Sequence, residues 1–420
     1  MTLQVVLGLG FGDEGKGTIV DWLARRARRG SGPPLVVRWN GGPQAAHHVV
    51  TDDGRTHCFA QLGSASFVPG ARTHLGPEMA VDLYALQVEA QVFGDDVLAR
   101  TTIDPRCVLV TPWHAIVGRV REALRGAGRH GSTGRGVAEA KLGAHLVAGE
   151  LAGDQAHGFA GRLHELRAAL LATATALADD RPDHEARDQA RDLIARGGDR
   201  DLLDSFLEAA HRPRAITDRV PRADHVILES AQGALLDRDH GFFPHVTPSR
   251  ITRTAAEHAA RKLGLTGALE VWGVLRAYHT RHGEGPFPSE NAALAARLPE
   301  PHNRDDGPAG RFRVGWFDAV LARHALGFAG PIDRLAITCL DRIESMSGRA
   351  IVDAWHCAPG VDRVDRVDRV DNATAIAARP VVRIVDSVSA AIVQAVGRPL
   401  DVESWGPTAS AKRAPSLPSQ

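Results

Sequence analysis

The chain has 420 residues, 44% of them hydrophobic, which is enough for a large core in one big α/β domain or two smaller ones. Its 50 basic residues balance 50 acidic ones, which disfavours a nucleic-acid-binding protein, because such proteins usually carry a basic excess. The four cysteines are widely spaced, the N-terminus lacks the pattern of a signal peptide, and no long stretch is uninterruptedly apolar. These features predict a cytoplasmic protein without a membrane partner.

Short apolar runs that end in glycine or polar residues predict buried strands. The first run, Leu3–Gly8, precedes a helix-like stretch over Thr18–Arg28. The further predicted strands are Leu35–Trp39, His225–Leu228, Leu269–Leu275 and Arg334–Thr338. Strands that alternate with helical stretches predict an α/β fold with a large, mostly parallel central β-sheet flanked by helices. Ligands of such sheets bind beyond the carboxyl ends of the strands.

Three segments stand apart from this alternation. Residues 155–215 are rich in Ala, Leu, Arg and Glu at helical spacing, and we interpret them as a helical insertion within a single domain over residues 1–408. The repeated Val-Asp-Arg triplets in 361–371 indicate an expanded surface loop. Residues 409–420 have the composition of a disordered tail.

A glycine-rich loop between the first strand and the first helix carries the clearest chemistry. Gly10 to Lys16 has the G-x-x-x-x-G-K spacing of a phosphate-binding loop. Its glycines let backbone N–H groups face an anion, and the lysine neutralises phosphate oxygens. Gly17 stands where a P-loop has Ser or Thr, so a bound Mg²⁺ needs another ligand, and Asp13 is the nearest hard oxygen donor. The alternative is a plain glycine-rich turn.

The segment GDEGKG at 12–17 resembles the signature of the adenylosuccinate synthetase family. Further segments match that family in chain order, and the resemblance runs from about residue 3 to 408. These segments lie at 36–50, 132–141, 227–247, 275–290, 310–320, 335–341 and 404–408.

The resemblance implies a GTP-dependent ligase that makes adenylosuccinate from IMP and L-aspartate, with Mg²⁺ as cofactor, on a homodimeric fold with a large, mostly parallel sheet. It further implies that Asp13 takes the N1 proton of the purine and touches the metal, while His47 supports O6 as it attacks the γ-phosphate of GTP. The amino group of aspartate then displaces the 6-phosphoryl group. Alone, Asp13 could be a helix cap, and His47 is one of 20 histidines; its spacing from Gly41-Gly42 selects it over His48.

The remaining site residues follow from the same resemblance. The residues implied in GTP binding, with Lys16 also in catalysis, are Gly12, Glu14, Gly15, Lys16, Gly17, Arg313, Asp341, Ser404 and Gly406. The residues implied for the acceptor nucleotide are Gln44, Thr133, Gln232, Thr247 and Arg311. Arg311 and Arg313 are implied for the carboxylates of the amino acid, which Arg side chains bind bidentately. The backbone of Ala46 joins Asp13 as an implied metal ligand.

The departures from the family pattern cluster around two ligands. Pro308 and Ala309 stand where the family has a Thr pair that binds aspartate, and Gly143-Ala144-His145 stands where an arginine reaches the partner subunit's IMP phosphate. Smaller departures are Pro43 and Gln44 for a His-Asn pair, Ala46 for glycine, and Cys339 for lysine. The loss of two hydroxyl contacts costs roughly 1–3 kcal/mol each if their partners stay unpaired.

Two alternatives therefore stay open. The first is a divergent paralogue that applies the same GTP-activated chemistry to another purine-like nucleotide or nucleoside, or to another amine. The second is a non-catalytic GTP-binding or scaffold protein, which the combination of Asp13, Lys16 and His47 disfavours. Asp13 also disfavours a 2-aminopurine acceptor, since such an acceptor would need the space of its carboxylate.

Overall fold

A computed structural model describes residues 1–30, 32–94, 96–180, 184–212, 214–300, 303, 310–356 and 370–415. Three expectations fall outside these ranges: the Pro308-Ala309 substitution, Cys357, and the triplet repeat over 361–369. Cys58, Cys107 and Cys339 lie within them and carry free thiols. Among the described helices, none combines the length and the apolar character that a membrane crossing requires.

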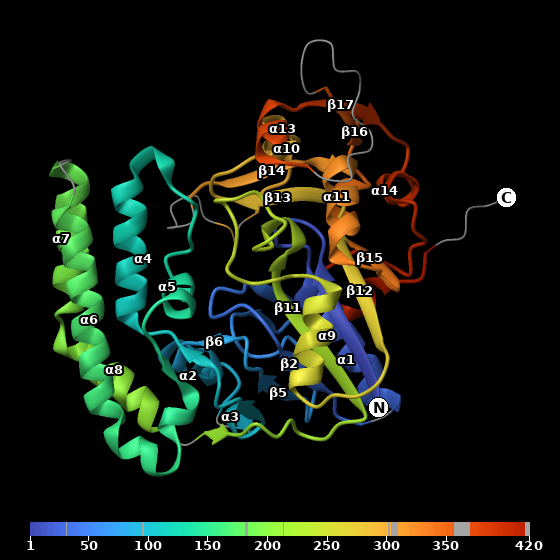
Figure 1. Ribbon diagram of the computed structural model, residues 1–420. Coiled ribbons are helices and arrows are strands. Elements are labelled where there is room, and N and C mark those ends of the chain that lie inside the picture. Colours follow the sequence, from blue (N-terminus) through green and yellow to red (C-terminus); the bar gives the residue numbers. More distant parts are fainter. Residues whose placement is uncertain are drawn as a thin grey trace.

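The centre of the molecule is a large sheet that is parallel apart from its last strand (Figure 1). In the described residues its strands, in spatial order, are β10 (Ala215–Ile216), β7 (Thr101–Ile103), β5 (Arg72–Leu75), β2 (Leu35–Arg38), β11 (His225–Gly233), β1 (Thr2–Gly8), β12 (Leu269–Arg276), β15 (Arg334–Thr338), β18 (Val402–Ser404) and β19 (Lys412–Arg413). The predicted fold class, an α/β protein with a mostly parallel central sheet, is confirmed.

The predicted strands correspond closely to observed ones, and β15 has the predicted bounds. The largest difference is β11, which continues to Gly233 although we predicted its end at Leu228. Its last part, with Glu229 and Gln232, lacks the apolar character of a buried strand. Pairing with β1 nevertheless extends it, with a register shift between Val6 and Gly8, and this polar end is where the site lies.

Smaller sheets extend the structure beyond the carboxyl ends of the central strands. One consists of β13 (Tyr278–His282), β14 (Phe312–Asp318), β16 (Ala350–His356) and β17 (Arg379–Ile384). The others are the hairpin β3 (His47–Val50) with β4 (Thr56–Phe59), and β6 (Ala80–Val81) with β8 (Val108–Leu109) and β9 (Leu146–Val147).

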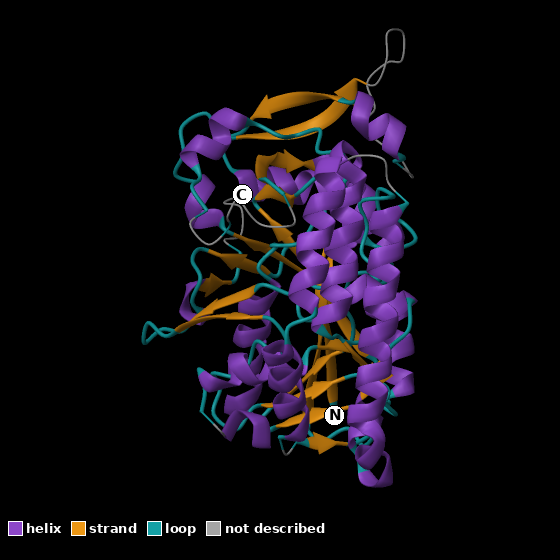
Figure 2. Cartoon of the chain, turned by 90° about the vertical axis from the view of Figure 1, so that its left-hand side faces the viewer, coloured by secondary structure: helices purple, strands orange, loops and turns teal. Residues whose placement is uncertain are grey.

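Helices cover the central sheet and form a separate layer at one side (Figures 1 and 2). The side layer, in which α4, α6 and α7 pack on one another, is at the left of Figure 1. The expected helical insertion over 155–215 contains α6, α7 and α8. The α-helices are α1 (Lys16–Gly30), α2 (Leu83–Gln91), α3 (Asp96–Ala99), α4 (Pro112–Arg125), α5 (Val137–Leu142), α6 (Phe159–Asp179), α7 (His184–Gly197), α8 (Arg200–His211), α9 (Arg253–Lys262), α10 (Ala292–Arg297), α11 (Ala319–Ala329), α12 (Leu340–Ile343), α13 (Asn372–Ala377) and α14 (Val388–Val396).

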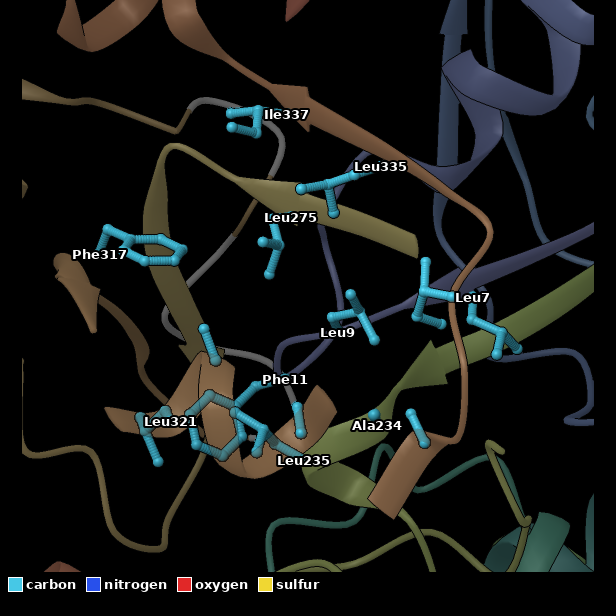
Figure 3. Close-up of a cluster of buried hydrophobic side chains, with 14 of the residues drawn as sticks. Leu7, Leu9, Phe11, Ala234, Leu235, Leu275, Phe317, Leu321, Leu335 and Ile337 are labelled. Atoms are coloured by element: carbon cyan, nitrogen blue, oxygen red, sulfur yellow. The ribbon is translucent and has the colours of Figure 1, made fainter. Parts of the chain in front are cut away.

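The largest buried apolar cluster lies directly under the glycine-rich loop. Leu7, Leu9 and Phe11 alternate with glycines and pack against Leu235 and Leu275 of neighbouring segments (Figure 3). The intervening Gly8 and Gly10 leave room for the buried side chain of Glu14. The core thus holds the loop from beneath.

The expectation of a disordered tail from Ala409 onward is wrong for its first residues. Ala409–Ala411 form a 3₁₀ turn, and Lys412–Arg413 form β19, which pairs antiparallel with β18. Composition missed this element because backbone pairing with β18 and the hydrogen bonds of Lys412, rather than apolar residues, hold it in place. Residues 416–420 lie outside the described ranges.

Candidate active site

The glycine-rich loop leaves the carboxyl end of β1 and ends at Lys16, where α1 begins. Gly12 and Gly15 have φ angles of 96° and 81°, in the left-handed region that glycine adopts at little cost. The loop therefore approaches the N-terminus of α1 with a backbone that other residues would strain. A helix N-terminus preceded by such a loop is a suitable site for phosphate.

The side chain of Glu14 braces this loop from inside. Its Oε1 accepts hydrogen bonds from the backbone N–H groups of Gly10 (2.9 Å) and Gly12 (2.8 Å), and its Oε2 accepts from Lys16 Nζ at 2.6 Å. A Cβ atom on Gly8 or Gly233 would lie 2.2 Å from this carboxylate. These two glycines thus make room for a carboxylate that orients the lysine.

Asp13, the residue expected to act as a base, is held by two neighbours. Its Oδ2 lies 3.0 Å from His282 Nε2, and Arg276 Nη1 donates to its backbone carbonyl at 3.1 Å. Burial alone would raise the pKa of Asp13, but His282, Arg276 and Lys16 together hold this pKa below its ordinary value. The carboxylate is therefore ionised and ready to accept a proton.

His282 was not among the residues that the sequence singled out. It lies at the end of β13, inside the matched segment 275–290, and nothing in its spacing distinguishes it from nearby His279. Burial lowers its pKa, but the bond and charge of Asp13 outweigh burial, and the net shift is upward. Only the packing of the β13 sheet beyond β1 brings the two side chains together.

His47 forms a second carboxylate–histidine pair with Glu229 of β11. Its Nδ1 lies 2.5 Å from Glu229 Oε1, and Ser64 donates to the same carboxylate through its N–H and its hydroxyl. Burial lowers the pKa of His47. Burial would raise the pKa of Glu229, but the charges of His47 and Arg38 lower it to about 2.

This pairing fixes the orientation of the His47 ring. With Glu229 ionised, the proton of the neutral imidazole belongs on Nδ1, and Nε2 points away without a hydrogen-bond partner. A buried unpaired nitrogen costs free energy unless a ligand meets it. Glu229 was also missed by the sequence analysis, although it lies in the matched segment 227–247.

The structure explains why residue 17 is glycine and not the usual Ser or Thr. A Cβ atom at Gly17 would lie 2.8 Å from the Cβ of His47 and 3.0 Å from Ser64 Oγ. The strand that carries His47 therefore packs directly on the start of α1. Asp13 and Lys16 belong to the loop that leads into α1, and His47 packs on Gly17 in the first turn of that helix, so the three predicted catalytic residues lie at one end of α1.

Within the described residues, the non-glycine residues with positive φ all lie in or beside this region. They are Asp13 (58°), Gln232 (59°) and Cys339 (59°). Such a conformation costs of order 1 kcal/mol or more for most side chains, and it is frequent at functional sites. Each of the three residues follows the end of a central strand or lies at its end.

The residues expected at the acceptor come together only in part. Thr247 Oγ1 lies 3.5 Å from Gln232 Oε1, and Gly41, beside the loop that holds Gln44, packs close to the Gln232 amide. Thr133 is exposed on a separate loop. That loop reaches the Thr247 segment through a contact between His245 Nδ1 and the carbonyl of His130 at 3.1 Å.

Arg311 and Arg313 converge on one carboxylate. Glu290 accepts from Arg311 Nη2 at 2.6 Å and from Arg313 Nη1 at 3.2 Å. Burial lowers the pKa of Arg313, and Glu290 partly offsets this. The two guanidinium groups thus bind one carboxylate. In this structure that carboxylate belongs to Glu290, which the sequence did not indicate.

The residues expected at the guanine base lie at the far end of the sheet. Asp341 lies at the start of α12, and partial desolvation of its carboxyl group raises its pKa. Ser404 Oγ donates to the carbonyl of Gly406 at 3.0 Å. Asp341 follows β15 and Ser404 ends β18, and these two strands are neighbours in the sheet.

Hard oxygen donors for a metal are few. The described residues contain no group of three or more His, Cys, Asp and Glu side chains that could hold a metal ion. Asp13 keeps one carboxylate oxygen outside its bond to His282, and Ala46, next to His47, is exposed. This fits Mg²⁺, which usually takes one or two protein ligands and completes its shell with phosphate and water.

Comparison with known proteins decides the family. The sequence pattern of adenylosuccinate synthetases matches residues 5–387. The adenylosuccinate synthetase of Azotobacter vinelandii is 34% identical over 85% of this chain and 81% of its own length. The chain belongs to the adenylosuccinate synthetase family. The family enzyme of Chromohalobacter salexigens is 32% identical over 82% of this chain and 77% of its own length.

Solved structures agree with this fold. Adenylosuccinate synthetase from Plasmodium falciparum superposes with a TM-score of 0.77 at 20% identity and covers 99% of this chain and 100% of its own. The succinoaminodeoxyadenylate synthetase of cyanophage S-2L gives a TM-score of 0.59 at 17% identity, with coverage of 98% and 95%. The chain is thus a ligase of the adenylosuccinate synthetase type, from a family that generally uses GTP and Mg²⁺.

Proposed function

We propose that this chain uses GTP to phosphorylate O6 of IMP and then replaces the phosphoryl group with the amino group of L-aspartate. The products are adenylosuccinate, GDP and phosphate. The observation that carries the proposal is the convergence of Asp13, Lys16 and His47 at the N-terminus of α1, with each acid–base residue held by its own partner.

In the first step Asp13 accepts the N1 proton of the purine, and the electron pair moves to O6. O6 then attacks the γ-phosphorus of GTP, and the bond to the β-phosphate oxygen breaks. The negative charge of the bound phosphates raises the pKa of His47, so that Nε2 gains a proton and donates a hydrogen bond to O6. Glu229 stabilises the resulting imidazolium through Nδ1.

In the second step the amino group of aspartate attacks C6 and forms the C–N bond, while the C6–O6 bond breaks. The phosphate leaves with O6, and the proton lost by the amino group passes to this phosphate or to solvent. Arg311 and Arg313 would bind the carboxylates of aspartate in place of Glu290. Gln44, Thr133, Gln232 and Thr247 would hold the IMP phosphate and ribose as polar donors. A homodimer is part of the proposal, because the resemblance places the acceptor site near the partner subunit.

GTP would bind through the backbone of Gly12, Glu14, Gly15 and Gly17 and through the Lys16 ammonium. The glycine conformations and the helix N-terminus support this placement. Asp341 would accept from guanine N1 and N2, and Ser404 and Gly406 would close over the base.

Mg²⁺ would be held by the Asp13 carboxylate and the Ala46 carbonyl, with phosphate oxygens and water as its other ligands. Its chemistry is to neutralise charge on the transferring phosphate. Glu14 binds loop N–H groups and Lys16, so its carboxylate is not offered to the metal.

A second candidate function rests on one specific observation. Gly143 and His145 lie where the resemblance expects a phosphate-binding arginine, and His145 is exposed and bonded to the carbonyl of Gly143 at 2.8 Å. With Pro308 and Ala309 also changed, this favours a different acceptor or amine for the same activation chemistry. Asp13 still points to a 6-oxopurine without a 2-amino group.

One experiment separates the two candidates. The full chain is incubated with GTP, Mg²⁺ and aspartate, with IMP or inosine in turn, while phosphate release and product mass are measured. Adenylosuccinate formed from IMP at a rate of at least about 1 s⁻¹, a typical enzyme rate, supports the proposed function. Phosphate release and a new product with inosine, but not with IMP, support the second candidate and exclude the first.

A further inference from the structure

The end of the described chain forms a closed hairpin over the start of α1. We call Ser404–Arg413 the C-terminal strap. Within it, Ser404 of β18 lies directly opposite Lys412 of β19, and Trp405 N–H donates to the carbonyl of Ala411 at 3.0 Å. Ser404 and Lys412 are only 1% and 9% exposed. Cross-strand neighbours share one face of a sheet, so the two side chains face the same interior.

Lys412 ties the strap to itself and to α1. Its Nζ donates to the carbonyls of Thr408 (2.7 Å), Gly406 (3.1 Å) and Pro407 (3.2 Å), and to the hydroxyl of Thr18. Thr18 in turn donates to Pro407 O at 2.7 Å. An ammonium group has three protons, and all three are engaged here. The strap is thereby held on the first turn of the helix whose N-terminus faces the phosphate loop.

The hydrogen bonds of Lys412 all go to neutral oxygens, one hydroxyl and three backbone carbonyls. Burial lowers its pKa to about 8, against the raising effects of Asp21, Cys339 and Asp341. Burial raises the pKa of Asp341, and the charge of Lys412 offsets a small part of that rise.

A second tether joins the strap to the strand that carries His47. Ser410 donates to Asp52 Oδ1 through its hydroxyl at 2.5 Å and through its N–H at 3.4 Å. Asp52 lies in the turn between β3 and β4, and β3 begins at His47. The strap thus contacts both the helix that would bind the phosphates and the hairpin of the catalytic histidine.

We propose that Lys412 is a positioning residue that determines specificity for guanine: its bonds to the strap carbonyls and its place opposite Ser404 hold Ser404 and Gly406 closed over the base. The proposal rests on the proposed function only in that Asp341, Ser404 and Gly406 bind the base of GTP. Lys412 does not touch the reacting atoms. Its loss should open the base site while the phosphate loop, braced by Glu14, stays formed.

The test compares nucleotide binding by the full chain and by its Lys412→Met variant, using calorimetry with GTP and with ATP in the presence of Mg²⁺. We expect the variant to bind GTP about tenfold more weakly, the effect of losing a charge-assisted hydrogen-bond set, and to bind ATP as before. In the ligase assay the KM for GTP should rise by a similar factor, while kcat and the KM for IMP stay within about twofold.

Two further variants make the result specific. Arg413→Met removes the charge of the exposed neighbour on β19 and should behave as the unmodified chain. Lys412→Arg keeps the charge and several donors, so it should recover most of the preference for GTP that Lys412→Met loses. If the methionine variant does not fold, the nucleotide binding of Lys412→Arg is compared with that of the unmodified chain instead.

The outcomes separate this inference from the proposed function. Equal loss of GTP and ATP affinity, or unchanged GTP affinity in Lys412→Met, would overturn the role of Lys412. If the unmodified chain binds GTP but makes no adenylosuccinate, the proposed function fails and the binding comparison still decides the role of Lys412. If it does not bind GTP, both fail.

Discussion

The Nδ1 atom of His47 and the Oε1 atom of Glu229 lie 2.5 Å apart in a part of the site from which solvent is excluded. The two residues come from different strands, β3 and β11, and Ser64 N–H completes the carboxylate's hydrogen bonds at 3.0 Å. A carboxylate that orients an imidazole and stabilises its protonated form is a recurrent arrangement in catalytic sites. The first prediction follows from it.

Glu229→Gln should lower kcat by about 10- to 100-fold with little change in the KM for GTP, because the amide keeps the shape but cannot stabilise the imidazolium of His47. Steady-state kinetics of phosphate release would show this. Glu208→Gln, on the exposed face of α8, is the matched control and should be neutral. A variant with normal kcat would mean that the pair is only structural.

Asp13→Asn should lower kcat by about 10²- to 10⁴-fold, the usual contribution of a general base. GTP affinity should change less, since Lys16 and the loop backbone are untouched. The measurement is product formation with saturating GTP and IMP. Asp96→Asn, at an exposed position in α3, controls for a general effect of charge loss. Full activity in Asp13→Asn with every acceptor tested would refute the proposed mechanism.

Gly17→Ala should reduce both stability and kcat, because the new Cβ would lie 2.8 Å from the Cβ of His47 and must displace the strand that carries it. We expect a loss of roughly 1–3 kcal/mol in the free energy of unfolding, measured by urea denaturation. Gly161→Ala in α6, where the added Cβ meets open space, should be neutral or slightly stabilising. Equal effects of the two changes would contradict the packing described for Gly17.

Asp341→Asn should reduce the preference for GTP over ATP by about 10- to 100-fold, because an amide cannot accept from both guanine N1 and N2. The ratio of kcat/KM for the two nucleotides is the measurement. Asp386→Asn, in an exposed turn before α14, should leave this ratio unchanged. A preserved ratio in Asp341→Asn would place guanine recognition elsewhere.

The buried carboxyl group of Asp318 should make the stability of the fold depend on pH, independently of catalysis. Burial raises its pKa from 3.8 to about 7, although Leu321, Trp355 and Val320 donate hydrogen bonds that lower it. The folded chain therefore binds a proton that the unfolded chain releases between these values, and stability falls as pH rises from about 4 to 7.

In the Asp318→Asn variant this part of the pH dependence should disappear. The difference in unfolding free energy between the variant and the unmodified chain should then shrink by roughly 2–4 kcal/mol as pH rises from 4 to 8. Denaturant unfolding at several pH values checks this. Parallel curves for the two proteins would show that Asp318 is ionised throughout.

Much of the fold could be predicted from local patterns of apolar residues and glycines in the sequence. Apolar runs with glycine ends located β1, β2, β12 and β15 to within a residue or two, because buried parallel strands leave a continuous apolar signature. The same signature failed at the end of β11, where the strand carries polar residues toward the site. It failed again at β19, a short strand without apolar residues that pairs with β18 and contains the buried Lys412.

The residues of the site likewise comprise some that the sequence indicated and others that only the structure identified. The order and spacing of residues in this chain determined the phosphate loop, the family and the candidate pair Asp13 and His47, because a tight turn at a helix N-terminus needs its glycines and lysine at fixed local offsets. The pairing of His282 with Asp13, Glu229 with His47, Glu290 with the two arginines, and Lys412 with Thr18 was decided only by the tertiary structure. Each partner approaches from a distant strand or loop, and the contacts between such elements depend on how the sheets pack in space, which spacing along the chain does not encode.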